Sequence, residues 1–140
     1  MIIMTLVEKQ NSIIEEFDLF EDWIQKYEYI IELGKDLPII KPEDKKDSQL
    51  IEGCQSRVWV DAIFVDGKMK FKGDSDAIIT KGIISLLIDI LDNQSPNDII
   101  KSDLFFINKI GLQDHLSPTR ANGLLSMVNR MKQESLKYIN

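Results

Sequence analysis

The sequence is poor in the side chains that most often build disulfides and metal sites. Its 140 residues include one cysteine and one histidine. One cysteine cannot form an internal disulfide, and one cysteine with one histidine cannot supply the usual ligands of a structural zinc ion. The glycine-rich fingerprints of phosphate-binding loops are also absent from the sequence. These absences exclude a disulfide-stabilised scaffold and a zinc-dependent fold.

Basic charge and long apolar runs are scarce as well. The chain has 23 acidic and 17 basic side chains, for a formal charge of −6, whereas nucleic-acid binding requires clustered Lys and Arg. Residues 83–91, the most apolar segment, contain Asp89 and fall far short of the ~20 residues of a membrane-spanning helix. The N-terminus lacks the basic region and cleavage site of a signal peptide. We expect a cytoplasmic protein that binds neither nucleic acid nor membranes.

The rest of the composition is that of an ordinary globular protein, and the length fits a single domain of residues 1–140. Helical spacing of apolar residues predicts helices in the first and last thirds of the chain. The first helix starts with the capping box of Thr5 and Glu8, and the second follows Asp22 and ends at Gly34 as its C-cap. Further helices are predicted at 77–91 with an N-cap from 74–76, after Ser95-Pro96, at 103–110, and at 118–138 after Ser117.

The middle of the chain predicts an antiparallel sheet. Residues 58–65 are rich in β-branched and aromatic side chains, and Asp66-Gly67 is typical of a type I′ hairpin turn. The return strand alternates lysine and apolar residues over 68–72. Leu50-Ile51 is predicted to add a third strand, which would make residues 53–56 a loop between strands. The fold class is therefore α+β, a small three-stranded antiparallel sheet packed by helices.

Cys54 is the first candidate for chemistry, although a free cysteine is often only a small buried hydrophobe. It follows Gly53, a residue that permits backbone angles which other residues avoid, so the thiol is expected at a sharp bend. Arg57 lies three residues further on, and a nearby cation favours the reactive thiolate. From the residues alone, a reactive thiol and an inert thiol in an acidic adaptor both stay open.

His115 is the one imidazole that could serve Cys54 as general base in a thiol hydrolase or transferase. No oxyanion-hole signature accompanies it, and a role in a turn or helix start is the simpler interpretation. A metal site that combines the two residues lacks any paired-ligand spacing. Arg120 falls in the first turn of a predicted helix, where a cation opposes the helix dipole, so it indicates either a specific partner or a solvent-facing side chain.

Four blocks of the sequence resemble the SufE family of sulfur acceptors. They are Tyr29 to Gly34, Ile51 to Trp59, Gly73 to Ala77 with Thr80 to Gly82, and His115 to Arg120 with Gly123 and Leu124. The blocks follow the expected order from about Phe17 to Met131, and Gly-Cys-Gln-Ser-x-Val-Trp is the most specific of them. The resemblance implies an α+β fold similar to IscU-type scaffolds, with the cysteine on a loop at one end of the sheet.

The resemblance implies a sulfur carrier that is not itself an enzyme. A SufS-like cysteine desulfurase would form a persulfide, and Cys54 would accept its terminal sulfur, stimulate desulfurase turnover and deliver the sulfur to a SufB-like scaffold that assembles iron–sulfur clusters. The pyridoxal phosphate of this reaction belongs to the desulfurase, so no cofactor and no metal are expected in this chain. The chain also lacks the additional cysteines that hold a cluster in IscU-type scaffolds.

The same resemblance assigns roles to residues near Cys54. Gly53, Gln55 and Ser56 would shape its loop, and Asp74 would lie on the neighbouring loop. Arg57 and Arg120 would support the site or form part of the partner surface. His115 matches some members of the family and is given no catalytic role.

Overall fold

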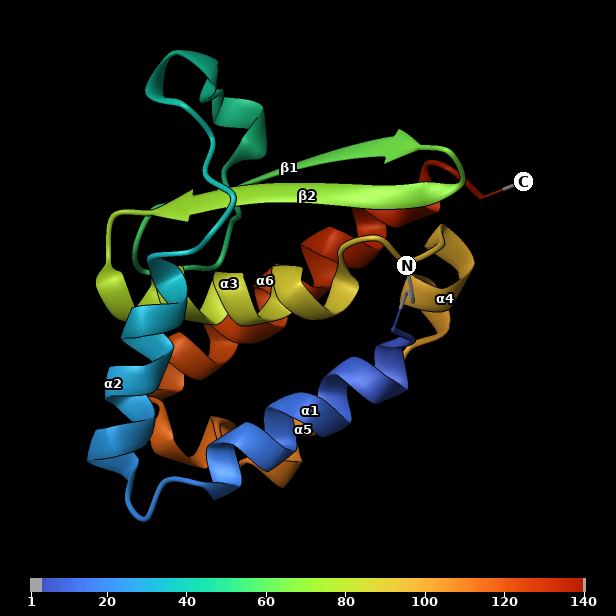
Figure 1. The fold of residues 1–140 in the computed structure, drawn as a ribbon. Helices are drawn as coiled ribbons and strands as arrows, with labels where there is room; N and C mark the ends of the chain where they lie inside the picture. The colour runs from blue at the N-terminus through green and yellow to red at the C-terminus, as the bar shows by residue number, and fades with distance from the viewer. Residues whose placement is uncertain (1–3, 140) are drawn as a thin grey trace.

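The computed structural model describes residues 4–139 and packs helices on one face of an antiparallel hairpin (Figure 1). The first three residues of the apolar N-terminal stretch and the last residue of the predicted domain lie outside this range. The helices are α1 (Leu6–Asp18), α2 (Trp23–Gly34), α3 (Ile78–Leu91), α4 (Pro96–Lys101), α5 (Phe106–Lys109) and α6 (Pro118–Leu136). The strands are β1 (Val58–Val65) and β2 (Lys68–Ser75), and 3-10 turns occur at Pro42–Asp44, Asp47–Gln49 and Gln113–His115.

The predicted hairpin is confirmed, but the predicted third strand is wrong. Asp66 and Gly67 have φ values of 52° and 78°, as a type I′ turn requires. Within residues 4–139 the sheet has two strands. Leu50 forms only an isolated bridge opposite Trp59, and the Ile51 N–H donates to the Val58 carbonyl at 2.8 Å. A 3-10 turn directly before Leu50 and a turn directly after Ile51 leave too little extended chain for a ladder.

Most of the predicted helix starts are confirmed by their caps. The Glu8 N–H donates to the Thr5 hydroxyl at 3.1 Å, and the Thr5 N–H donates to the Glu8 carboxylate at 3.0 Å. Asp22, Ser95 and Ser117 cap their helices through their side chains. The predicted helix at 103–110 is shorter in the structure, where it spans Phe106–Lys109.

Two predicted caps are wrong because tertiary contacts use the residues differently. The N-cap of α3 is Ala77, and the Asp76 carboxylate instead accepts from the Arg57 N–H at 3.1 Å. Gly34 is the last residue of α2 rather than its C-cap. A Cβ on Gly34 would lie 3.0 Å from the backbone nitrogen of Gly82 on α3, and one on Gly82 would lie 2.1 Å from the Ile30 carbonyl oxygen. Glycine therefore permits the close crossing of α2 and α3.

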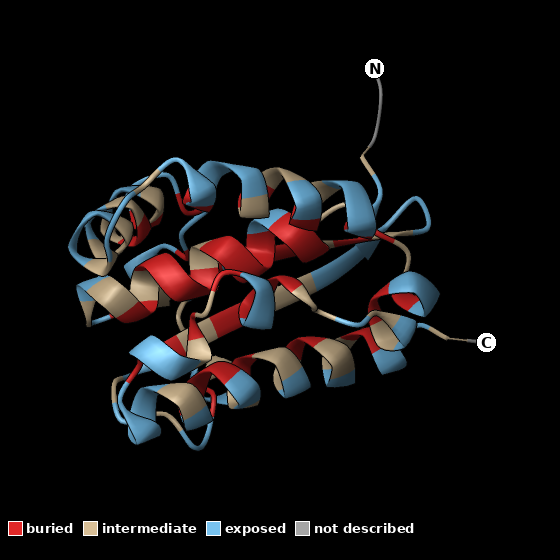
Figure 2. Cartoon of the chain, turned by 90° about the horizontal axis from the view of Figure 1, so that it is seen from below, coloured by how far each residue is buried: buried red, intermediate tan, exposed pale blue. Residues whose placement is uncertain are grey.

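α3 is the centre of the core, as its apolar sequence predicts. It contacts β2, α1, α2 and α6, and Figure 2 shows it as the most continuously buried helix, between α1 and α6. Residues 42–49 lie over the opposite face of the sheet (Figure 1), where the Lys45 ammonium sits 4.2 Å from the ring centroid of Trp59. Among the described residues, no helix is long and apolar enough to cross a membrane. The start of β1 and the start of α3 lie at one end of the hairpin (Figure 1). Cys54 lies four residues before β1 and lines the same cavity as Thr80 of α3, so it belongs to this end.

Candidate functional site

The Cys54 loop lies between Ile51 and β1 and is held against α6. Gly53 has φ +89°, a conformation that L side chains rarely adopt, so the expected sharp bend is present. A Cβ on Gly53 would also lie 2.6 Å from the hydroxyl oxygen of Ser126 on α6. Backbone angle and available space therefore both require glycine next to the cysteine.

Cys54 is half-buried and opens into a cavity of about 290 Å³ between three segments of the chain. Its Sγ lies 3.6 Å from the carbonyl oxygen of Gly123 on α6 and can donate a weak hydrogen bond to it. A Cβ on Gly123 would come 3.5 Å from that sulfur, an ordinary van der Waals contact, so the sulfur lies directly beside the backbone of α6. The other lining residues are Gln55, Ser56, Thr80, Ile83, Thr119, Arg120 and Met127.

Burial controls the acidity of the thiol. It raises the pKa of Cys54 above the ordinary value of a cysteine, because a half-buried thiolate loses hydration. Arg57 does not offset this effect: its side chain is exposed, it does not line the cavity, and its backbone N–H donates to Asp76. The sequence-based expectation that Arg57 favours the thiolate is therefore not met in this arrangement, and the resting thiol is protonated at neutral pH.

Arg120 reaches the cavity, whereas His115 does not line it. Arg120 is an exposed residue in the first turn of α6. The imidazole of His115 stacks on Trp23 with 4.0 Å between ring centroids, and its Nδ1 lies 2.8 Å from the Gly111 carbonyl oxygen. Because a carbonyl can only accept, this nitrogen carries a proton. The fold thus brings one cation to the rim of the cavity and directs the imidazole to other partners.

Residues 11–135 match the family model "SufE: Fe-S metabolism associated domain". The chain belongs to the SufE family. The resemblance seen in the sequence is thereby confirmed, and this SufE-family protein is associated with Fe–S metabolism. The chain is also similar to the solution structure of a hypothetical protein from Thermus thermophilus, with 21% identity, 92% of this chain and 94% of that chain covered, and a TM-score of 0.76. At this identity the similarity shows a shared fold.

Asp74 lies outside the cavity of this SufE-family chain. It is in strand β2 rather than on a loop, opposite Trp59. Its carboxylate forms ion pairs with Lys45 at 2.7 Å and Lys81 at 3.5 Å. Partial burial raises the pKa of Asp74. Hydrogen bonds from Lys45 and the Ser75 N–H lower it, as do the charges of Lys81 and Lys45, and overall the pKa lies below its ordinary value. Asp74 therefore ties residues 42–49 to the first turns of α3.

Of the residues from α3 and α6 that complete the SufE-family cavity, sequence reasoning singled out Arg120 but gave no role to Thr80, Gly123 or Met127. Thr80 is a buried polar residue in a largely apolar helix, and it lies in the block Thr80 to Gly82 that resembles the family, but neither signal places its side chain at the thiol. Gly123 lies in a block that resembles the family, but its contact with the thiol depends on where α6 packs. Met127 lies one turn further along α6 and is indistinguishable in sequence from an ordinary core residue.

Proposed function

We propose that this protein is a sulfur acceptor of Fe–S metabolism. In this proposal Cys54 takes the terminal sulfur of a persulfide on a SufS-like cysteine desulfurase, stimulates its turnover and delivers the sulfur to a SufB-like scaffold. The observation that carries the proposal is the position of the thiol: the one cysteine of the chain is half-buried at a cavity of about 290 Å³ instead of being packed in the core. That space can hold a side chain that is one sulfur atom longer.

The transfer step is an exchange between sulfur atoms. The Cys54 thiolate attacks the outer sulfur of the donor persulfide, a new S–S bond forms on Cys54, and the S–S bond of the donor breaks. The donor cysteine leaves as a thiolate, and the proton that Cys54 releases balances that charge. Neither an oxidant nor a reductant is required, because the transferred sulfur keeps its oxidation state. The chain has no second cysteine that could resolve the product as an internal disulfide.

We infer that the loop moves when the donor docks, because the Cys54 thiol is half-buried in its cavity beside the bend at Gly53, and this burial raises its pKa. Only the thiolate attacks, and a half-buried thiol is both protonated and shielded. Movement outward about Gly53 would hydrate the sulfur, lower its pKa and expose it to the donor. Return to the cavity would then shield the new persulfide from reductants. Arg120 at the rim would stabilise either sulfur anion during these steps.

The main alternative, a thiol hydrolase or transferase with His115 as base, gains no support from the geometry. A general base must lie within hydrogen-bond reach of the proton that it removes. His115 stacks on Trp23 and bonds to Gly111, and it is absent from the lining of the Cys54 cavity. A sulfur carrier needs no base of its own when docking hydrates the thiol.

Intact-mass spectrometry tests the proposed function. The protein is incubated with a cysteine desulfurase and cysteine, without reductant, and we expect an adduct of one sulfur atom on Cys54. The Cys54→Ser variant should form no adduct and should not stimulate desulfurase turnover. His115→Ala serves as the control and should retain both properties. If the wild-type protein forms no adduct while the desulfurase is active, the proposal is wrong.

A further inference from the structure

An apolar groove with highly exposed side chains lies at the turn between α1 and α2. Its hollow of about 670 Å³ is lined by Leu19, Phe20, Gln25, Glu28, Tyr29, Ile31 and Glu32. Leu19 is 80% exposed, and the adjacent Ile24 is 71% exposed. Apolar side chains gathered on a surface and surrounded by polar groups are typical of a protein-binding site. None of the lining residues is shared with the Cys54 cavity.

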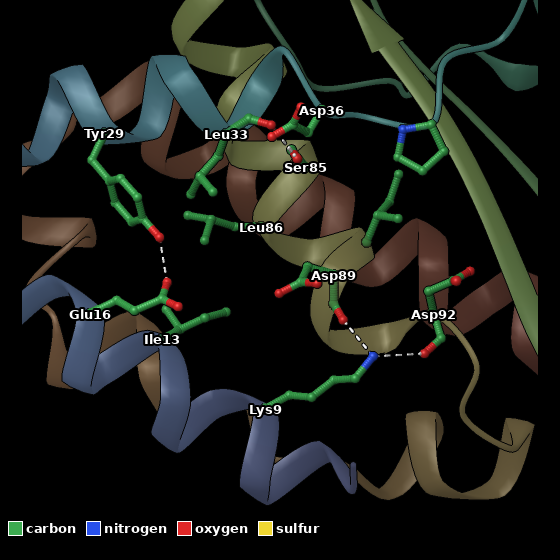
Figure 3. Close-up of a pocket in the computed structure, with 12 residues that line it drawn as sticks. Lys9, Ile13, Glu16, Tyr29, Leu33, Asp36, Ser85, Leu86, Asp89 and Asp92 are labelled. Carbon is green, nitrogen blue, oxygen red and sulfur yellow. Dashed lines mark hydrogen bonds between the residues drawn. The ribbon is translucent and has the colours of Figure 1, made fainter. Parts of the chain in front are cut away.

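A second hollow, of about 380 Å³, adjoins the first at Tyr29, which lines both (Figure 3). Leu33 provides apolar surface there, and the buried Ile13 and Leu86 form part of the floor. Carboxylates surround this surface, and Figure 3 shows them on α1, on α3 and at the end of α2. They belong to Glu16, Asp36, Asp89 and Asp92. The two hollows together form what we name the α1–α2 groove.

The carboxylates of the second hollow outnumber the basic side chains that line it. None of the four forms an ion pair within residues 4–139. Lys9 is the one basic residue that lines the hollow, and its ammonium donates to the backbone carbonyls of Asp89 at 2.8 Å and Asp92 at 3.3 Å. Partial burial raises the pKa of Asp89, and although Lys9 lowers that pKa, the charges of Glu16 and Asp92 raise it further. A cation placed here would therefore be stabilised.

The net charge of the chain lies in the segment that forms most of this groove. Residues 11–36 contain eight acidic and two basic side chains, a net charge of −6, whereas the rest of the chain contains 15 of each. All eight acidic side chains are exposed. Of the two lysines, Lys35 pairs with Glu32 and Lys26 lies 5.1 Å from the ring centroid of Trp23. A surface of this charge repels nucleic acid and anionic lipid and attracts basic protein segments.

We propose that the α1–α2 groove is a docking surface for a basic amphipathic segment of a partner protein. The apolar face of the segment covers Leu19, Phe20 and Ile31. A lysine or arginine lays its alkyl stem along Leu33 and places its charge among the carboxylates of the second hollow. No group of three acidic, histidine or cysteine side chains in the described part of the chain is close enough to hold a metal ion. The groove thus favours an extended cationic side chain.

This surface goes beyond the proposed sulfur transfer and does not depend on it. Because the groove and the Cys54 cavity have no residue in common, a partner can occupy the groove while the thiol exchanges sulfur with another protein. The test below measures binding alone, so its outcome and that of the mass-spectrometry experiment are independent.

Fluorescence anisotropy with a labelled helical peptide that has one leucine face and one lysine face tests the groove. We expect saturable binding that weakens with salt. Removing three carboxylates at the groove should weaken binding about tenfold, which corresponds to about 1.4 kcal/mol or about 0.5 kcal/mol for each exposed pair. The groove variant carries Glu16→Gln, Asp36→Asn and Asp89→Asn, at three exposed carboxylates of the second hollow. The matched control removes three exposed acids elsewhere, through Glu43→Gln, Asp66→Asn and Asp114→Asn, and should bind as the wild type does.

The apolar part of the surface is tested separately. Leu19→Ser should weaken binding, whereas Leu136→Ser, at another exposed leucine, should not. All these positions are exposed, so the variants should keep the thermal midpoint of the wild type, measured by circular dichroism. The proposal is overturned if the wild type does not bind the peptide, if both triple variants lose the same affinity, or if an all-lysine peptide binds equally well.

A second copy of the chain is the alternative occupant, because Lys68, Lys70 and Lys72 form a basic row on β2. Sedimentation velocity at low and high salt decides between the two. We expect a monomer at both salt concentrations. A dimer that disappears when the three lysines are changed to glutamine would assign the groove to a second copy and overturn the proposal.

Discussion

Gly53 offers a quantitative test of how the Cys54 loop is held. Replacing it with alanine adds two separate costs. The first is backbone strain, about 1–2 kcal/mol for an L residue in the left-handed region, where Gly53 has φ +89°. The second is overlap, because the new Cβ would lie 2.6 Å from the Ser126 hydroxyl oxygen. Moving that side chain out of its rotamer costs about 1 kcal/mol. We expect Gly53→Ala to lower the free energy of unfolding by about 2–3 kcal/mol.

The chain supplies a control for each cost. Gly67 has φ +78° and nothing within 4 Å of an added Cβ, so Gly67→Ala measures the backbone strain alone, about 1–2 kcal/mol. Ser126→Ala removes the hydroxyl that overlaps and should restore about 1 kcal/mol of the loss in Gly53→Ala. Urea denaturation of the four variants, including the double variant, gives the free energies of unfolding and the coupling between the two positions.

Two results would refute this account of the loop. If Gly53→Ala costs no more than Gly67→Ala, the loop is not held against α6 at Ser126. If Ser126→Ala restores nothing, the extra cost arises elsewhere in the loop. The same variants should change the proposed sulfur-acceptor reaction only through the loop, because neither residue lines the Cys54 cavity.

Four further predictions concern the thiol, an ion pair, a helix crossing and the imidazole. Because burial raises the pKa of Cys54, alkylation by iodoacetamide at neutral pH should be slower than in the urea-unfolded chain. Because the folded state disfavours the thiolate, the free energy of unfolding should fall as pH rises above about 8.5, the ordinary pKa of a cysteine. Cys54→Ala should remove this pH dependence. Asp74→Asn should lower the free energy of unfolding by about 1 kcal/mol at neutral pH. Because the folded pKa of Asp74 is lowered, this advantage of the wild type should disappear as pH falls through that pKa, which urea denaturation from neutral to acidic pH measures. Gly82→Ala should cost more than about 3 kcal/mol by urea denaturation, since its Cβ would lie 2.1 Å from the Ile30 carbonyl oxygen and two backbones would have to separate. His115→Ala should leave the stimulation of a desulfurase within about twofold of the wild type, a difference of less than about 0.5 kcal/mol. A loss of stimulation equal to that of Cys54→Ser would favour the hydrolase alternative.

Features that depend on a few neighbouring residues were predicted well. The capping box of Thr5 and Glu8 and the type I′ turn at Asp66-Gly67 both form as the sequence indicates. Each is stabilised by contacts between residues at most three positions apart, so the local sequence contains the information. The predicted strand at Leu50-Ile51 failed because a strand requires a long extended segment as well as suitable side chains, and the turns on either side shorten it.

The environment of Cys54 shows the limit of the same reasoning. Arg57 is three residues from the cysteine in sequence, yet the thiol lies against Gly123 on α6, and the cavity is completed by Thr80 from α3. The sign of the pKa shift follows from that burial and not from the nearby charge in the sequence. Asp74 likewise pairs with Lys45 and Lys81, which no spacing rule connects to it.

The sequence by itself determined the α+β class, the local caps and turns, the presence of one thiol beside a glycine and the excess of acid in the first part of the chain. The tertiary structure decided that the thiol faces a cavity and is protonated at rest, that His115 is directed away from it, and that the acidic side chains surround the apolar α1–α2 groove. The physical reason is the range of the interactions involved. Hydrogen bonds of caps and turns join neighbours along the chain, whereas burial, cavity shape and charge pairing depend on helices that are distant in sequence and meet only after packing.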